Sequence, residues 1–128
     1  MHLEKQEDTI ELFHEAGNWK LKKESGFSPI QMTVAAAAAC SGYVYAKILK
    51  KKRIPYENME IEVDYTQNLD VPVHVIQSIH IRFQLAVAKE HREQAEKGLK
   101  LVKKGCPVVQ SLNPEVQITE QVKFVSGE

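Results

Sequence analysis

Residues 28–53 constrain the fold more than any other part of this chain. They read SPIQMTVAAAAACSGYVYAKILKKKR, and within residues 30–39 the polar side chains are Gln31 and Thr33. A helix that is apolar on nearly every side is normally a buried helix. Its small alanines would let other elements approach closely. The segment therefore predicts a long central helix that runs through the core.

The sequence also predicts where this helix begins and ends. Ser28 can cap the N-terminus, Pro29 suits the first helical position, and Gln31 completes an S-x-x-Q capping box. The cations that lead to Arg53 suit the negative end of the helix dipole, and Pro55 stops the helix. About 24 helical residues at 1.5 Å each would span on the order of 36 Å.

The rest of the chain predicts strands and shorter helices. Residues 58–66 alternate apolar and polar side chains, which predicts a half-buried strand, and residues 73–87 predict a longer one that pairs with it as an antiparallel hairpin. Because strands and helices do not alternate strictly, the fold class is α+β. One face of each sheet must be covered by the long helix or by a second subunit. Further strands are expected at residues 9–13, 18–23 and 115–125, and further helices at residues 89–104 and 108–112.

Length and composition limit the possible functions. A chain of 128 residues fits a single domain over residues 1–128. Seventeen basic residues balance seventeen acidic ones, which argues against a dedicated nucleic-acid binder. No stretch reaches roughly 18 uncharged apolar residues, and the N-terminus lacks the pattern of a secretory signal. We therefore expect a cytoplasmic protein with no nucleic-acid or membrane partner.

Metal and carboxylate chemistry have little support in the sequence. The histidines show no compact ligand spacing, and two cysteines are too few for a four-ligand zinc site, so we predict no metal and no cofactor. The acidic side chains of the strand at residues 58–66 are interpreted as an exposed surface and not as a catalytic pair. The five histidines are His2, His14, His74, His80 and His91. The acidic side chains of the strand are Glu60, Glu62 and Asp64.

The two cysteines lie in different settings, and each has two interpretations. Cys106 precedes Pro107 at the expected start of a short helix, where free N–H groups and the helix dipole favour a thiolate. Cys40 lies among alanines, where burial would keep it inert. Both could be small buried hydrophobes. If they meet, however, one thiolate can attack an O–O bond and form a sulfenic acid, with which the other condenses to a disulfide.

The two cysteine motifs, taken together, resemble those of the OsmC/Ohr superfamily. SPIQMTVAAAAACSG resembles the proline-led, alanine-rich helix that carries the peroxidatic cysteine, and GCPVVQSL resembles the C-P-V motif that carries the resolving cysteine. The resemblance covers the chain from Gly26 to its C-terminus. It implies an OsmC-like α+β fold in which antiparallel sheets wrap around a long central helix in an intertwined homodimer.

The resemblance also implies an activity, the thiol-dependent reduction of organic hydroperoxides with an external thiol reductant. Cys40 would attack the peroxide and Cys106 would resolve the product. Tyr43 follows Cys40 by nearly one turn, and Trp19 and Tyr43 are expected to line its cavity. The predicted substrate-binding residues are Tyr43, Ile30, Gln31 and Trp19.

The sequence departs from the peroxidase pattern in two places. Active members carry a glutamate directly after the helix-leading proline, where this chain has Ile30. They also use an arginine from the N-terminal region, whereas no arginine precedes Arg53 here. Lys20, Lys22 and Lys23 are the available cations, and lysine cannot copy a bidentate guanidinium. The open alternatives are a peroxidase, a weakened relative of one, a non-enzymatic dimer that binds a small apolar ligand or senses oxidation, and a structural dimer.

Overall fold

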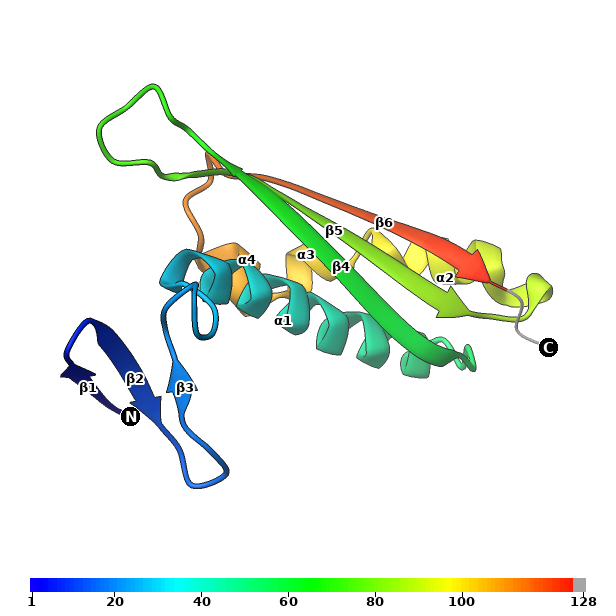
Figure 1. The fold of residues 1–128 in the computed structure, drawn as a ribbon. Coiled ribbons are helices and arrows are strands. Elements are labelled where there is room, and N and C mark those ends of the chain that lie inside the picture. Colours follow the sequence, from blue (N-terminus) through cyan, green and yellow to red (C-terminus); the bar gives the residue numbers. More distant parts are fainter. Residues whose placement is uncertain (126–128) are drawn as a thin grey trace. The chain divides into compact units, whose positions relative to one another are not determined.

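The computed structural model describes residues 1–125, which form a mixed α+β structure with two small sheets and one long helix (Figure 1). The predicted fold class is therefore confirmed. The chain divides into two compact units, Met1–Ala35 and Ala36–Glu128. That residues 1–128 form a single domain stays a prediction, and its last three residues lie outside the described part of the chain.

The first unit contains a three-stranded antiparallel sheet in the order β1-β2-β3. The sequence predicted β2, and it predicted β3 as a longer strand. It missed β1, whose side chains are all exposed and whose sequence HLEKQ lacks an apolar alternation. Glu7 has a positive φ of 56° in the turn that joins β1 to β2. The strands are β1 (His2–Gln6), β2 (Thr9–Phe13) and β3 (Trp19–Lys20).

The long helix α1 spans Pro29–Lys51 and begins with the predicted capping box. The backbone N–H of Ser28 donates to Oε1 of Gln31 at 2.9 Å. In return, the backbone N–H of Gln31 donates to Oγ of Ser28 at 3.1 Å. Two of the free N–H groups at the start of the helix are thus satisfied by side chains, as the S-x-x-Q pattern requires.

The C-terminal end of α1 is capped by backbone hydrogen bonds before the chain reaches Pro55. Arg53 takes a left-handed conformation with φ 56°. Its N–H donates to the Lys50 carbonyl at 3.0 Å, and the Ile54 N–H donates to the Leu49 carbonyl at 2.9 Å. This pair of bonds is a Schellman motif, in which Arg53 holds the position that glycine usually takes.

The second unit contains a sheet in the order β4-β5-β6. β4 (Glu57–Gln67) and β5 (Ile76–Ala86) pair antiparallel, with Val63 opposite Ile81, as the hairpin prediction required. β6 (Gln117–Val125) instead runs parallel to β5. The expectation of purely antiparallel sheets is therefore wrong for this strand. A crossover through helices returns the chain in the same direction, which is the connection that parallel strands require.

Four short helical segments form this crossover: η1 (Lys89–His91), α2 (Arg92–Leu99), α3 (Val102–Gly105) and α4 (Pro107–Ser111). The sequence predicted one helix over residues 89–104, but the chain breaks between α2 and α3. There the N–H groups of Lys100 and Leu101 bond to carbonyls three residues back, at 3.3 and 3.0 Å. Such bonds tighten a turn and end a regular α-helix.

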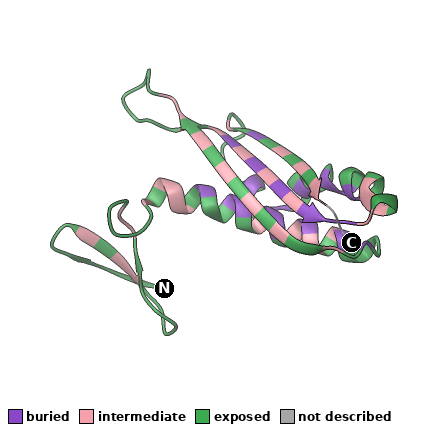
Figure 2. Cartoon of the chain, turned by 45° about the vertical axis from the view of Figure 1, so that its right-hand side comes forward, coloured by how far each residue is buried: buried purple, intermediate pink, exposed green. Residues whose placement is uncertain are grey.

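The core of the second unit lies between this sheet and the helices. Along β5 the buried residues alternate with more accessible ones, as the colours of Figure 2 show. The Tyr45 ring of α1 meets the Phe83 ring edge-to-face at 5.1 Å, and its hydroxyl donates to the Ala95 carbonyl of α2 at 2.7 Å. A Cβ on Gly42 would lie 2.6 Å from Cδ1 of Ile61, so glycine allows α1 to approach β4 closely.

One stripe of α1 remains exposed in the second unit. Tyr43 is 76% exposed in this stripe, whereas Tyr45 and Leu49 on another face are fully buried. By length and composition alone, α1 is apolar enough to cross a membrane. Its buried face packs against β4 and β5. The exposed stripe consists of Ala36, Ala39, Tyr43, Lys47 and Lys50.

Candidate functional site

The structure brings the two cysteines together. Cys40 lies in the middle of α1, and Cys106 lies between α3 and α4. Both are free thiols. The Cys106 thiol lies near Cys40 and raises the pKa of the Cys40 thiol. The structure therefore places the two thiols near each other, as the sequence analysis required.

The start of α4 acts on a different sulfur from the one that the sequence suggested. Cys106 occupies the N-cap position, but its side chain makes no capping hydrogen bond. The backbone N–H of Val108, in the first turn of α4, instead lowers the pKa of the Cys40 thiol. Sequence reasoning had considered the effect of this helix N-terminus on Cys106 and not on Cys40.

Burial nevertheless dominates the acidity of Cys40. Burial raises the pKa of the Cys40 thiol, and the neighbouring Cys106 raises it further. The Val108 N–H opposes these effects but does not outweigh them. The net pKa lies above the ordinary value, so Cys40 is protonated at neutral pH.

A hollow of about 700 Å³ lies beside Cys40. Its wall is mostly apolar, and Lys47, Lys50 and Lys51 add positive charge. Cys40 is half-buried in this wall, whereas Cys106 is fully buried. Cys40 is therefore the sulfur that a small molecule can reach. The apolar part of the wall is formed by Cys40, Tyr43, Val44, Ile48, Gly105 and Pro107.

Of the predicted substrate-binding residues, the structure places Tyr43 in the wall that holds Cys40. The other three lie in the first unit. The side-chain oxygen of Gln31 accepts the capping bond from Ser28, and Ile30 is half-buried in the first turn of α1. Trp19 lines a small apolar hollow of about 250 Å³ in that unit. Their role toward Cys40 stays a prediction.

The lysines that the sequence offered in place of an arginine also lie in the first unit. Lys22 pairs with Asp8, which raises the pKa of the lysine and lowers that of the carboxyl. Lys20 and Lys23 are exposed. The charge of Lys22 is thus already matched by a neighbouring carboxylate.

Sequence reasoning missed Ser41, the residue after Cys40. Ser41 is fully buried, and its hydroxyl donates to Sγ of Cys106 at 3.7 Å. Cys106 therefore contacts two consecutive residues of α1. Sequence gives no signal for this contact, because a serine in a helix is usually exposed or bonded to its own backbone.

Sequence reasoning also missed Glu120, although the sequence pattern marks this residue as unusual. Glu120 interrupts the apolar alternation of β6 between Ile118 and Val122. Burial raises the pKa of its carboxyl, while Lys103 and Ser41 act in the opposite direction. Within residues 1–125, its buried Oε2 has no hydrogen-bond partner. A charged residue on the apolar face of a strand is the pattern that marks it.

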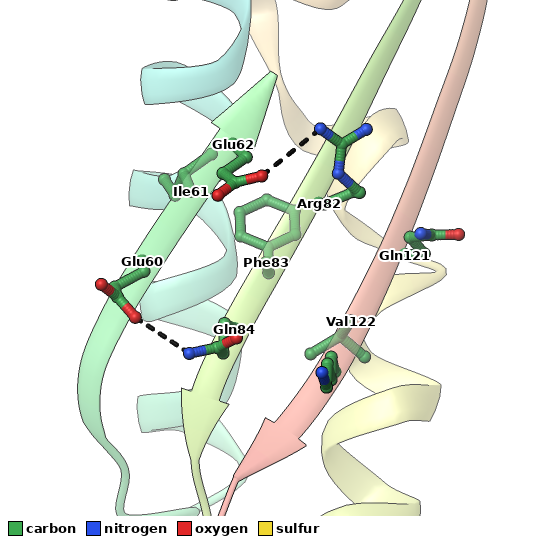
Figure 3. Close-up of a pocket in the computed structure, with 9 residues that line it drawn as sticks. Glu60, Ile61, Glu62, Arg82, Phe83, Gln84, Gln121 and Val122 are labelled. Carbon is green, nitrogen blue, oxygen red and sulfur yellow. Dashed lines mark hydrogen bonds and ion pairs between the residues drawn. The ribbon is translucent and has the colours of Figure 1, made fainter. Parts of the chain in front are cut away.

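The outer face of the same sheet carries a second hollow, of about 490 Å³. Figure 3 shows that its polar side chains pair with one another, Glu62 with Arg82 and Glu60 with Gln84. Arg82 also pairs with Asp64 at 2.7 Å. The acidic side chains are exposed, as predicted, and their charges are partly matched by Arg82. The described part of the chain, residues 1–125, has no group of three or more His, Cys, Asp or Glu that could hold a metal ion.

The mixed sheet, the alanine-rich helix and the adjacent thiols define an α+β protein with a dithiol site. The chain belongs to the OsmC-like protein family, whose model matches residues 22–121. The comparison with curated proteins gives no match.

Solved structures of this family share the fold. An OsmC-like protein from Mycoplasma pneumoniae has a TM-score of 0.76 at 16% identity, over 92% of this chain and 89% of that chain. The organic hydroperoxide resistance protein OhrB of Bacillus subtilis has 0.60 at 17%, over 90% and 89%. An organic hydroperoxide resistance protein OsmC from Legionella pneumophila has 0.67 at 16%, over 94% and 99%. At these identities the likeness concerns the fold.

Proposed function

We propose that this protein is a thiol-dependent peroxidase that reduces organic hydroperoxides through Cys40 and Cys106. The observation that carries the proposal is the adjacency of the two free thiols beside an apolar hollow. The names of the hydroperoxide resistance proteins with this fold agree with it. The apolar wall suits an organic substituent better than hydrogen peroxide, and Tyr43 would contact that substituent.

The chemistry proceeds in three balanced steps. The Cys40 thiolate attacks the terminal oxygen of ROOH, so that the O–O bond breaks and Cys40 becomes a sulfenic acid while RO⁻ leaves as ROH after protonation. Cys106 then attacks the sulfenic sulfur, which forms the disulfide and releases water. An external thiol reductant finally returns both cysteines to the reduced state by thiol–disulfide exchange.

The raised pKa of Cys40 makes this peroxidase slow at neutral pH. The attacking species is the thiolate, and only a small fraction of Cys40 is ionised there. Neither a glutamate after Pro29 nor an N-terminal arginine is present in the sequence to change this. The alternative function that the same observation favours is a thiol sensor that is oxidised slowly and reversibly, or a dimer that binds a small apolar ligand.

We also propose that the active form is a cytoplasmic homodimer. The exposed stripe of α1 supports a second copy as its cover, since its alanines permit close approach of another helix. The hollow beside Cys40 adjoins this stripe, because Tyr43 and Lys47 belong to both. The partner would then complete the wall of the site.

Stopped-flow assays with cumene hydroperoxide and hydrogen peroxide test the function. Repeated turnover of the organic peroxide with a thiol reductant, at a rate that increases with pH, supports the enzyme, whereas reversible oxidation without turnover supports the sensor. Thiols that react with neither peroxide indicate a structural dimer. Cys40→Ser should abolish turnover, and Cys106→Ser should leave a single turnover. Activity that survives Cys40→Ser would reverse the assignment of roles.

A further inference from the structure

We propose that the Ser41 hydroxyl stabilises the thiolate of Cys106 when this cysteine attacks oxidised Cys40. The inference rests on the proposed function and concerns the step that forms the disulfide. Ser41 contacts the reacting sulfur itself, so it acts on this step directly and not through another residue.

The contact that carries the proposal is a hydrogen bond inside the second unit. Oγ of Ser41 donates to Sγ of Cys106 at 3.7 Å. Both residues are 0% exposed, so water does not surround this sulfur. Within residues 1–125, the Ser41 hydroxyl is the donor that bonds to it. The hydroxyl therefore takes the place that solvent has around an exposed thiol.

The direction of this hydroxyl is unusual for a serine inside a helix. A serine or threonine in a helix commonly donates to the carbonyl four residues back. Thr33 donates in this way to the Pro29 carbonyl at 2.9 Å, and Ser111 to the Pro107 carbonyl at 2.7 Å. Ser41 instead donates to a residue that lies 65 positions further along the chain. The fold thus directs this hydroxyl to the sulfur and not to its own helix.

A hydroxyl in this place has its largest effect when the sulfur is charged. A thiolate that is removed from water is costly in free energy unless a donor compensates for the lost solvent. A hydrogen bond also becomes stronger when its acceptor is ionised. The bond from Ser41 is therefore stronger to the Cys106 thiolate than to the thiol, and the thiolate is the form that attacks.

The titratable groups of neighbouring elements do not replace this donor. Lys103 of α3 directs its Nζ to a backbone carbonyl of β6 at 3.1 Å. Glu120 of β6 has a buried Oε2 without a hydrogen-bond partner among residues 1–125, and a carboxylate cannot donate to a thiolate. Cys40 of α1 is the group that Cys106 attacks. The neutral serine hydroxyl remains as the group that can stabilise the charge.

The proposed step balances. The Cys106 sulfur loses its proton and attacks the sulfenic sulfur of Cys40, so that the S–S bond forms and the S–O bond breaks. The hydroxide that leaves takes up this proton and departs as water. The sulfenic sulfur accepts the electron pair, so no further oxidant is needed. Ser41 keeps its own proton throughout and contributes a hydrogen bond alone.

An aromatic disulfide, 5,5′-dithiobis(2-nitrobenzoate), tests this step without any peroxide. One equivalent reacts with the accessible Cys40 and releases a first coloured thiolate. Cys106 then attacks the Cys40 sulfur, its proton passes to solvent, and a second coloured thiolate is released. The rate constant of the second release does not depend on reagent concentration, and it is measured from about pH 5 to about pH 9.5.

Three variants are compared with the wild type. Ser41→Ala removes the hydroxyl in a helix that is already rich in alanine. Ser41→Gly also lacks the hydroxyl, and it carries the test if Ser41→Ala does not fold. Ser111→Ala is the matched control, because it makes the same substitution in a helix where the hydroxyl bonds to the backbone and not to the sulfur.

Ser41→Ala and Ser41→Gly should slow the second release about tenfold at neutral pH, since a hydrogen bond to a charged group contributes roughly this factor or more. The pH at which the rate constant reaches half its limiting value should rise by about one unit. The difference in rate should shrink as pH rises, because the thiol then ionises without the hydroxyl. Ser111→Ala should match the wild type at every pH.

Two results would overturn the inference. One is a pH profile of Ser41→Ala that coincides with the wild-type profile or lies above it. The other is a uniform slowing with an unchanged midpoint, since that indicates a structural role alone. A wild type that releases one coloured thiolate and no second would contradict both this inference and the role of Cys106 as resolving thiol. If the profile moves as expected but no hydroperoxide is reduced, the proposed peroxidase fails while the role of Ser41 stands.

Discussion

The backbone N–H of Val108 lowers the pKa of the Cys40 thiol, so the first turn of α4 acts on the cysteine of α1, while Cys106 at its own N-cap makes no capping hydrogen bond. This relationship assigns the two thiols different environments. Cys40 faces a hollow and receives an N–H donor, whereas Cys106 is fully buried and receives the Ser41 hydroxyl. The account of attack by Cys40 and resolution by Cys106 depends on this difference.

The reactivity of Cys40 should rise steeply with pH. Because burial raises its pKa, the thiolate fraction is small at pH 7 and grows through and above the ordinary thiol pKa of about 8.5. Alkylation of Cys40 by iodoacetamide, followed by peptide mass analysis, should show a midpoint above that value. Cys106→Ala should lower the midpoint, since Cys106 is one of the groups that raises it. A midpoint below 7 would contradict the proposed environment.

Tyr45→Phe should destabilise the protein, whereas Tyr43→Phe should not. Tyr45 is fully buried, and removal of its hydroxyl leaves the Ala95 carbonyl without the 2.7 Å bond that it now accepts. The loss of one buried hydrogen bond of this kind costs about 0.5–1.5 kcal/mol. Tyr43 is the matched control, because it lies on the exposed stripe of the same helix. Urea unfolding of both variants measures the difference, and equal midpoints would contradict it.

Glu120→Gln should stabilise the protein at pH 7 but not at pH 4. The folded-state pKa of Glu120 is raised, so between the unfolded value near 4.5 and the folded value the native state binds more protons. Wild-type stability therefore falls as pH rises through this window. Below the window both states are protonated and the carboxyl contributes no difference. The gain should be on the order of 1 kcal/mol, the low end for a buried unsatisfied group.

Thermal unfolding of wild type and Glu120→Gln at both pH values measures this effect. The melting temperatures should diverge as pH rises from 4 to 7. A Glu120→Gln variant that is less stable than the wild type at pH 7 would show that the ionised carboxylate is stabilising, against the expectation.

Ala39→Arg should separate the proposed dimer. Ala39 lies in the exposed stripe of α1, where a long charged side chain would keep a second helix at a distance. Gln121→Arg is a matched control on the exposed outer side of β6. Analytical ultracentrifugation should give a monomer for Ala39→Arg, and a dimer for the wild type and the control. A wild-type protein that sediments as a monomer would contradict the proposed dimer.

Local patterns predicted much of the fold. The capping box at Ser28 and Gln31, the alternation along β4 and β5, and the start of α4 at Pro107 all depend on neighbours in sequence. The direction of β6 could not be predicted in this way, because it depends on where the preceding helices deliver the chain. β1 was missed because an exposed strand carries no apolar alternation.

The candidate site, like the fold, was predicted only in part. The two cysteine motifs led to Cys40 and Cys106, and helical spacing led to Tyr43. The contact of Ser41 with Cys106 joins residues from α1 and the start of α4. No local pattern contains this distance. The raised pKa of Cys40 was predicted from its place among alanines, because burial is its largest cause, whereas the opposing effect of the Val108 N–H comes from a distant element.

The adjacency of the two thiols is tested most directly by the linkage that forms when the protein is oxidised. Reduced protein is treated with one equivalent of cumene hydroperoxide, quenched with an alkylating reagent, digested without reductant and analysed by mass spectrometry. The account predicts a Cys40–Cys106 disulfide within one chain, formed as the peroxide is reduced to its alcohol. Consumption of the peroxide with both cysteines recovered as alkylated thiols would contradict it.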